Sequence, residues 1–128
     1  MPTRKLKRVA LVENLHEQLP DPIRVEVCDT FWSRFRGLMF RRRMPSEAGV
    51  LLVGGQESRW DSAIHMLFVR FDLAVFWINS DMRVVDKVLA KAWRPAYVPR
   101  QAARLVLELH SDRYSCFKIG DKVKIIND

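Results

Sequence analysis

Leu73-Ala74-Val75-Phe76-Trp77-Ile78 is an unbroken apolar run, and the turn-like segment Asn79-Ser80-Asp81-Met82 follows it directly. Residues 83–92 then form a second segment rich in β-branched and apolar side chains. Two such segments joined by a short turn predict a β-hairpin. Because residues 73–78 are apolar at every position, we expect both faces of this strand to be buried and the strand to lie centrally in a sheet.

Segments on both sides of this hairpin show the alternation of apolar and polar residues that is typical of half-buried strands. Ile23, Val25 and Val27, for example, alternate with polar neighbours, and Leu105, Leu107 and Leu109 repeat the pattern near the C-terminus. We expect Gly54-Gly55 to form a turn that ends the preceding strand. The further segments predicted to be strands are residues 9–14, 23–28, 49–53, 61–68, 105–109 and 122–126.

One longer helix is predicted over residues 31–41, where Asp29 or Thr30 can cap its first turn. Four apolar side chains fall on one face of it at helical spacing. A helical turn is expected at residues 112–118. Strands and helices do not alternate regularly, so we predict an α+β, mainly β fold. It is one compact, mostly antiparallel sheet of about seven short strands, curled or closed into a barrel, with the helix packed on it.

The length of 128 residues suits a single domain, 1–128, with one hydrophobic core. No apolar run approaches the roughly 18 residues that a membrane-spanning helix needs, and we expect a cytoplasmic protein. Lys and Arg number 22 against 15 Asp and Glu, which gives a net charge of +7. This net positive charge has two interpretations. It keeps the protein in solution, or it attracts an anionic partner such as nucleic acid.

Several motifs together resemble one family, the domain-of-unknown-function family 192, also called uncharacterised protein family 0127. The resemblance covers residues 22–126, and it leaves 1–21 as an N-terminal extension or first strand. The motifs, in the order that the family has them, are Arg36-Gly37-Leu38-Met39, Gly49-Val50-Leu51-Leu52-Val53, Ile64-His65-Met66, Val75-Phe76-Trp77-Ile78 with Arg83-Val84-Val85, the stretch 103–109, and Ile119-Gly120-Asp121-Lys122-Val123.

The chain departs from this family in its central motif. Met66 is kept, but Phe68 and Val69 stand where the family has Asn and Thr, and Asp72 and Ala74 stand where it has Pro and Asp. Most of the polar cluster of the family is therefore replaced. The resemblance implies a compact β-rich fold and no established reaction.

The segment Trp93-Arg94-Pro95-Ala96-Tyr97-Val98-Pro99-Arg100, which we call the aromatic-basic loop, is the best candidate for a binding site. Its aromatic rings are costly to leave in water and serve well as binding anchors, and its prolines stiffen the backbone. Arg94 and Arg100 add positive charge. We expect Trp60 and the strand that contains His65 to lie beside it. The alternative is that Trp93 and Tyr97 cover one end of the barrel.

A second candidate is a basic patch for nucleic acid or another anion on the predicted helix. It consists of Arg34, Arg41, Arg42 and Arg43, and the alternative is a solvated helix end. Arg36 differs from these, because in a motif followed by Gly37 it can pin the helix to the barrel through a carboxylate.

Because no catalytic motif is evident, we expect a non-enzymatic domain that binds a small ligand or a protein partner through the aromatic-basic loop. The expected contact residues are Arg36, His65, Trp93, Arg94, Tyr97 and Arg100. The alternatives are a nucleic-acid-binding module on the basic helix, and an enzyme that uses His65 and Asp72. The spacing of His and Cys residues predicts no metal site, and no cofactor motif is present.

Overall fold

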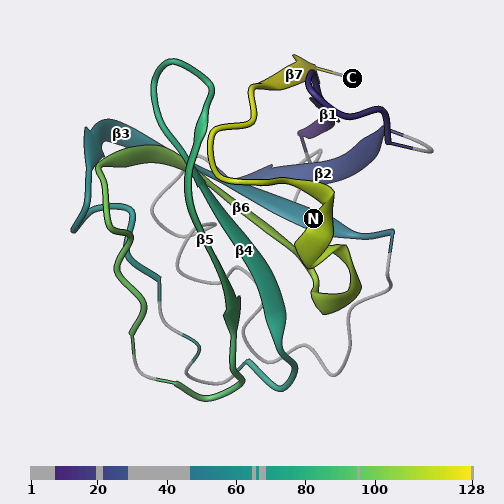
Figure 1. The fold of residues 1–128 in the computed structure, drawn as a ribbon. Coiled ribbons are helices and arrows are strands. Elements are labelled where there is room, and N and C mark those ends of the chain that lie inside the picture. The colour runs from purple at the N-terminus through teal and green to yellow at the C-terminus, as the bar shows by residue number, and fades with distance from the viewer. Residues whose placement is uncertain are drawn as a thin grey trace, which may run out of the picture.

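The computed structural model describes residues 8–19, 22–28, 47–64, 66, 69–94 and 96–127. Seven strands form one sheet in the order β5-β4-β6-β3-β2-β1-β7 (Figure 1). Their bounds are β1 Val9–Asn14, β2 Ile23–Cys28, β3 Gly49–Ser58, β4 Leu73–Ile78, β5 Val84–Ala90, β6 Ala103–His110 and β7 Val123–Asn127. Among the strands of the described residues, only β2 and β3 pair in parallel, so the mainly antiparallel sheet predicted from the sequence is confirmed.

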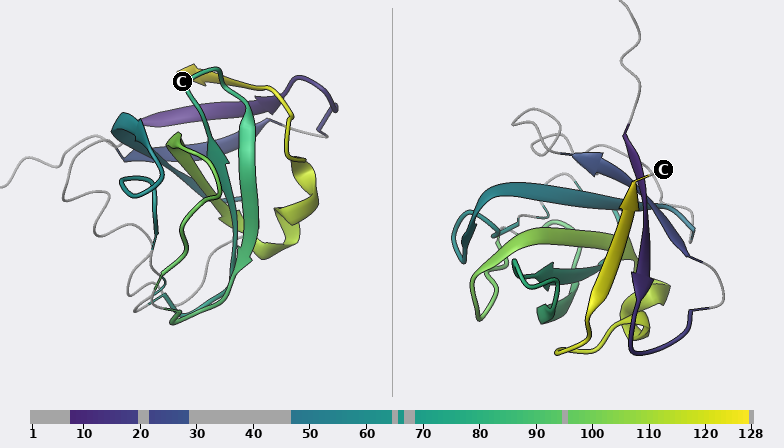
Figure 2. Two further views of the ribbon diagram at one scale, coloured as in Figure 1. Left: turned by 60° about the vertical axis from the view of Figure 1, so that its left-hand side comes forward. Right: turned by 90° about the horizontal axis from the view of Figure 1, so that it is seen from above.

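The sheet curls strongly, and its two edge regions meet. In two directions of view, β1 and β2 cross β4 and β5 at a steep angle (Figure 2). The turn before β5 then reaches the turn before β7, where Val84 N donates to Asp121 O at 2.9 Å and Gly120 N donates to Val84 O at 2.7 Å. These bonds close one end of the sheet into a partial barrel.

The predicted hairpin at the centre of the sequence is confirmed. β4 pairs with β5 on one side and with β6 on the other, and all six of its residues are buried. Its even residues Ala74, Phe76 and Ile78 belong to the core inside the curl, and Val75 and Trp77 belong to a second core cluster on the other face. An apolar side chain at every position follows from this burial on both faces.

Two predictions about strands were wrong. Gly54-Gly55 does not end a strand, because β3 continues to Ser58 with a register shift against β6 after Val53. A Cβ on Gly54 would lie 2.9 Å from the backbone oxygen of Arg104, so this glycine permits a close approach of β3 and β6 within the sheet. Residues 59–62 form a turn, and of the predicted strand 61–68 the described part contributes only an isolated bridge at Ile64.

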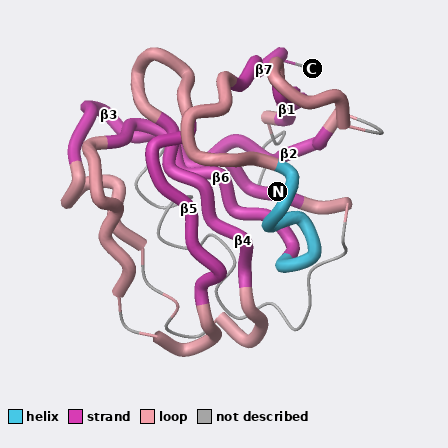
Figure 3. Tube along the Cα trace, viewed as in Figure 1, coloured by secondary structure: helices cyan, strands magenta, loops and turns pink. Residues whose placement is uncertain are grey.

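The short helical turn is confirmed as the 3-10 helix η1, Ser111–Cys116, which is the helical segment among the described residues (Figure 3). Phe117 follows it and packs edge-on against Phe76, with ring centroids 5.1 Å apart. The helix predicted over residues 31–41 lies outside the described residues. No helix in the described part of the chain is long and apolar enough to cross a membrane.

Candidate functional site

The aromatic-basic loop connects β5 to β6 and lies beside residues 59–66, the segment that follows β3 (Figures 1 and 3). Tyr97 N donates to Ile64 O at 2.8 Å, and Ile64 N donates to Tyr97 O at 3.0 Å. Farther along, Met66 N donates to Arg94 O at 2.8 Å. The loop is therefore one side of a short two-stranded ribbon and does not hang free in solvent.

Trp93 occupies an unusual backbone position for a large residue. It is the third residue of a turn that begins at Lys91, in which Arg94 N donates to Lys91 O at 3.3 Å. Its φ is 67°, in the left-handed region that glycine normally fills at this place in a turn. Its backbone nitrogen donates to Met66 O at 2.9 Å, and 52% of the residue remains exposed.

Tyr97 is placed differently from Trp93. It is half-buried and packs against the second core cluster. Its phenol oxygen accepts a hydrogen bond from Lys91 N at 2.8 Å, which ties the start of the loop to its middle. The guanidinium of Arg94 lies 5.9 Å from the centroid of the ring. One aromatic ring of the loop is thus an anchor, and the other is presented to solvent.

Two aspartates fix the ends of the loop. Asp72 accepts from Ala92 N at 2.9 Å, and this hydrogen bond is the main cause that holds the pKa of Asp72 below its ordinary value. Buried Asp86 on β5 accepts from Arg100 N at 2.9 Å and also from Lys87 N. Both carboxylates near the loop therefore accept from its backbone, Asp72 also lies 3.4 Å from Lys91 Nζ, and the side chains of Arg94 and Arg100 are exposed.

At the far end of the ribbon an arginine lies close to an exposed tryptophan. Arg59 donates from Nε to Pro99 O at 2.9 Å, and its guanidinium lies 5.6 Å from the ring centroid of Trp60. Trp60 is 72% exposed. The turn at residues 59–62 is joined to the sheet by Trp77 of β4, whose Nε1 donates to Ser62 O at 2.7 Å.

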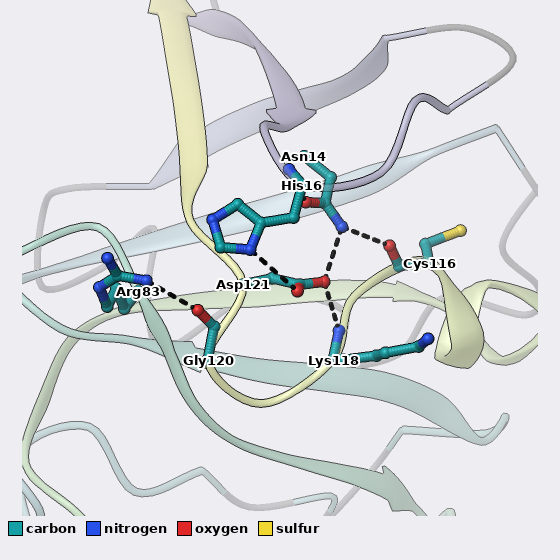
Figure 4. Close-up of polar contacts among 7 residues, drawn as sticks. All are labelled: Asn14, His16, Arg83, Cys116, Lys118, Gly120 and Asp121. Carbon is teal, nitrogen blue, oxygen red and sulfur yellow. Dashed lines mark hydrogen bonds and ion pairs between the residues drawn. The ribbon is translucent and has the colours of Figure 1, made fainter.

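A second polar cluster lies where the sheet closes, and the sequence did not single it out (Figure 4). Asn14 donates from Nδ2 to Asp121 Oδ2 at 2.8 Å and to Cys116 O at 3.0 Å. Lys118 N also donates to Asp121 at 2.8 Å, and His16 Nδ1 lies 3.7 Å from the other oxygen. Desolvation alone would raise the pKa of Asp121, but these polar contacts outweigh it and hold the pKa below its ordinary value. The cluster joins β1 to the turn before β7.

The third polar feature is Glu108, a buried carboxyl group on β6. It lies in register between Val50 of β3 and Val75 of β4 and is 6% exposed. Burial raises the pKa of this carboxyl to about 7. Glu108 lies between Leu107 and Leu109 in the sequence, a pattern that fits both a solvent-facing and a buried glutamate. Only the register of β6 against β3 and β4 shows that its neighbours are Val50 and Val75.

Other predicted site residues lie outside the described residues: Arg34, Arg36, Arg41, Arg42, Arg43 and His65. The basic-patch hypothesis and the proposed role of Arg36 therefore stay predictions. Within the described ranges, no group of three or more His, Cys, Asp or Glu residues is arranged to hold a metal ion. No disulfide joins Cys28 and Cys116.

Comparison with known proteins places these features in a family context. The profile of the DUF192 family, described as "Uncharacterized ACR", matches residues 12–125. A UPF0127 protein from Thermococcus kodakarensis is 40% identical over 85 residues, which are 66% of this chain and 52% of that protein. Another from Pyrococcus horikoshii is 34% identical over 102 residues, which are 78% of this chain and 85% of that protein. This chain thus spans about half the length of the Thermococcus kodakarensis relative.

Two solved structures share the fold. A Sinorhizobium meliloti protein superimposes with a TM-score of 0.78 at 20% identity, over 97% of both chains. A Novosphingobium aromaticivorans protein of unknown function gives a TM-score of 0.78 at 22% identity, over 97% of this chain and 89% of that one. At this level of identity the likeness extends to the fold alone.

Proposed function

This chain belongs to the uncharacterised DUF192 family, and we propose that it is a non-enzymatic binding domain whose site is the aromatic-basic loop. Trp93 carries the proposal. A bulky residue with φ near 67° costs stability, and so does an indole that is half exposed to water. A glycine would remove both costs. A strained, exposed tryptophan is therefore better explained by a role in binding than by a role in folding.

The rigidity of the loop supports this function. Its backbone is bonded to Ile64 and Met66 on one side, and Asp72 and Asp86 hold its two ends. The hydroxyl of Tyr97 adds a cross-link within it. A loop already ordered in the free protein loses little conformational entropy when a ligand binds, so its contacts contribute more fully to affinity.

The exposed side chains define the chemistry of the ligand. Trp93 offers an apolar, aromatic face, and Arg94 and Arg100 offer guanidinium groups that are exposed on the same loop. The neighbouring carboxylates of Asp72 and Asp86 accept hydrogen bonds from backbone nitrogens. A ligand with an apolar body and a negatively charged group suits this surface, because guanidinium groups bind carboxylate and phosphate with good geometry.

An NMR titration with 2-naphthyl phosphate tests the proposal directly. We expect the indole N–H signal of Trp93 and the amides of residues 91–101 to shift, with the remaining amides unchanged. Trp93→Gly keeps the turn and removes the ring, so it should abolish these shifts. Ile119→Ala removes another exposed apolar side chain and is the matched control. Shifts that survive in Trp93→Gly, or that map to another surface, would refute the loop as the site.

A further inference from the structure

We call residues 59–64 and 66 together with residues 91–94 and 96–100 the aromatic-basic ribbon. It carries an exposed tryptophan at each end: Trp60 is 72% exposed and Trp93 is 52% exposed. The guanidinium of Arg59 lies 5.6 Å from the ring centroid of Trp60, and Arg94 follows Trp93 in the sequence and lies 5.9 Å from the ring centroid of Tyr97. Hydrogen bonds between Ile64 and Tyr97 join the two segments midway. The two exposed indoles therefore lie on the two segments of one paired backbone.

Basic side chains outnumber acidic ones along this ribbon. Residues 91–100 contain Lys91, Arg94 and Arg100 and no acidic residue, and Lys91 Nζ lies 3.4 Å from Asp72 Oδ2. On the other segment, Asp61 is the acidic residue, and its carboxylate accepts from the side chain of Gln56. The exposed charges beside the tryptophans are therefore mainly guanidinium groups.

We propose that the aromatic-basic ribbon binds single-stranded nucleic acid. The inference rests on the proposed function of the loop and names its ligand. Unpaired bases have free faces that stack on exposed indoles, while arginines contact the phosphates that run between the bases. In a duplex the base faces are covered by their neighbours, so the tryptophans would contribute little. An acidic polypeptide would pair with the arginines but would offer no series of aromatic rings to stack on the two indoles.

Fluorescence anisotropy with a labelled oligothymidylate of about 15 nucleotides tests this ligand. Affinity should fall as salt rises, with a slope of about 0.7 per phosphate contact. Arg94→Ser with Arg100→Ser should lower that slope by roughly 1.4, because two phosphate contacts are removed. Lys122→Ser with Lys124→Ser removes equal charge from two exposed positions, one just before β7 and one on it, and should leave the slope unchanged.

The tryptophan variants separate stacking from charge. Trp60→Ala and Trp93→Ala should each weaken binding by roughly 5- to 100-fold, as expected for the loss of one stacked base. Trp93→Phe, which keeps an aromatic face, should recover most of the loss. Thermal unfolding of each variant confirms that the domain is intact.

Three results would overturn the inference. They are equal affinity for a duplex of the same length, equal affinity for a labelled poly-glutamate, and no binding of the oligonucleotide at about 50 mM salt, where phosphate contacts are strong. In each case the naphthyl phosphate titration decides separately whether the loop is a binding site. A loop that binds naphthyl phosphate but not the oligonucleotide would leave the proposed function standing and remove only this ligand.

Discussion

The phenol oxygen of Tyr97 accepts a hydrogen bond from the backbone nitrogen of Lys91 at 2.8 Å, across a separation of six residues. This bond closes the first half of the aromatic-basic loop on itself. The ring that makes it packs on the core, whereas the ring of Trp93, four residues earlier, is half exposed. The two aromatic residues of the loop therefore have separable effects, one on stability and one on binding.

Removal of the Tyr97 hydroxyl should loosen the loop without emptying the core. Tyr97→Phe leaves Lys91 N without its acceptor, and we expect a loss of about 0.5–1.5 kcal/mol in the free energy of unfolding. Tyr97→Ala also removes the packed ring and should cost about 3–5 kcal/mol. Urea denaturation measures both values. Equal stability of Tyr97→Phe and the unaltered protein would mean that the hydrogen bond contributes nothing.

Substitution of Trp93 by glycine, unlike the Tyr97 substitutions, should not lower the free energy of unfolding, because the backbone of Trp93 is strained. Trp93→Gly should leave the free energy of unfolding unchanged or raise it by up to about 1 kcal/mol, because glycine adopts positive φ without a steric cost. Trp93→Ala keeps the left-handed strain and should be no more stable than the unaltered protein. A loss above about 1 kcal/mol in Trp93→Gly would show that the indole stabilises the fold.

The contact between Asn14 and Asp121 predicts a specific acid sensitivity. The pKa of Asp121 lies below 3.8 in the folded protein, so its carboxylate stabilises the fold above that pH, and this contribution is lost as pH falls through the folded pKa. Asp121→Asn should cost about 1–3 kcal/mol at neutral pH and flatten the loss of stability in acid. Thermal unfolding between pH 2 and pH 7 measures this, with exposed Asp81→Asn as the control. A steep acid loss that persists in Asp121→Asn would contradict the assignment.

The strands could be predicted from local pattern because burial follows periodicity. The run 73–78 is apolar at each position, and the structure buries it on both faces. Gly54-Gly55 misled the prediction, because glycine marks turns and also marks places where two backbones approach closely. Only the position of β6 beside β3 distinguishes the two cases.

The candidate loop could be located from its composition, but its internal geometry could not be derived. Tryptophan gives no local signal for positive φ, because glycine is the residue expected there. The bonds from Arg100 to Asp86 and from Asn14 to Asp121 join residues 14 and 107 positions apart. Such contacts depend on how the sheet curls and closes, which no short stretch of sequence specifies.

Glu108 supplies the last prediction, a loss of stability as pH rises from mildly acidic to neutral. Burial between Val50 and Val75 raises its folded pKa to about 7 from 4.5, so the folded protein keeps a proton that the unfolded chain releases. Its contribution is therefore fully present below pH 4.5 and is lost as pH rises through about 7. The expected change is roughly 3 kcal/mol between pH 4 and pH 8.

Glu108→Gln has nearly the same shape and no charge, so it should be more stable than the unaltered protein at pH 8 and less dependent on pH between 4 and 8. Urea denaturation at a series of pH values measures the difference, and Glu17→Gln, at an exposed position in the loop after β1, is the matched control. If Glu108→Gln proves less stable at pH 8, the carboxylate is charged and paired in the folded protein. Its burial would then stabilise the fold through that pair, and the dependence on pH would have the opposite sign.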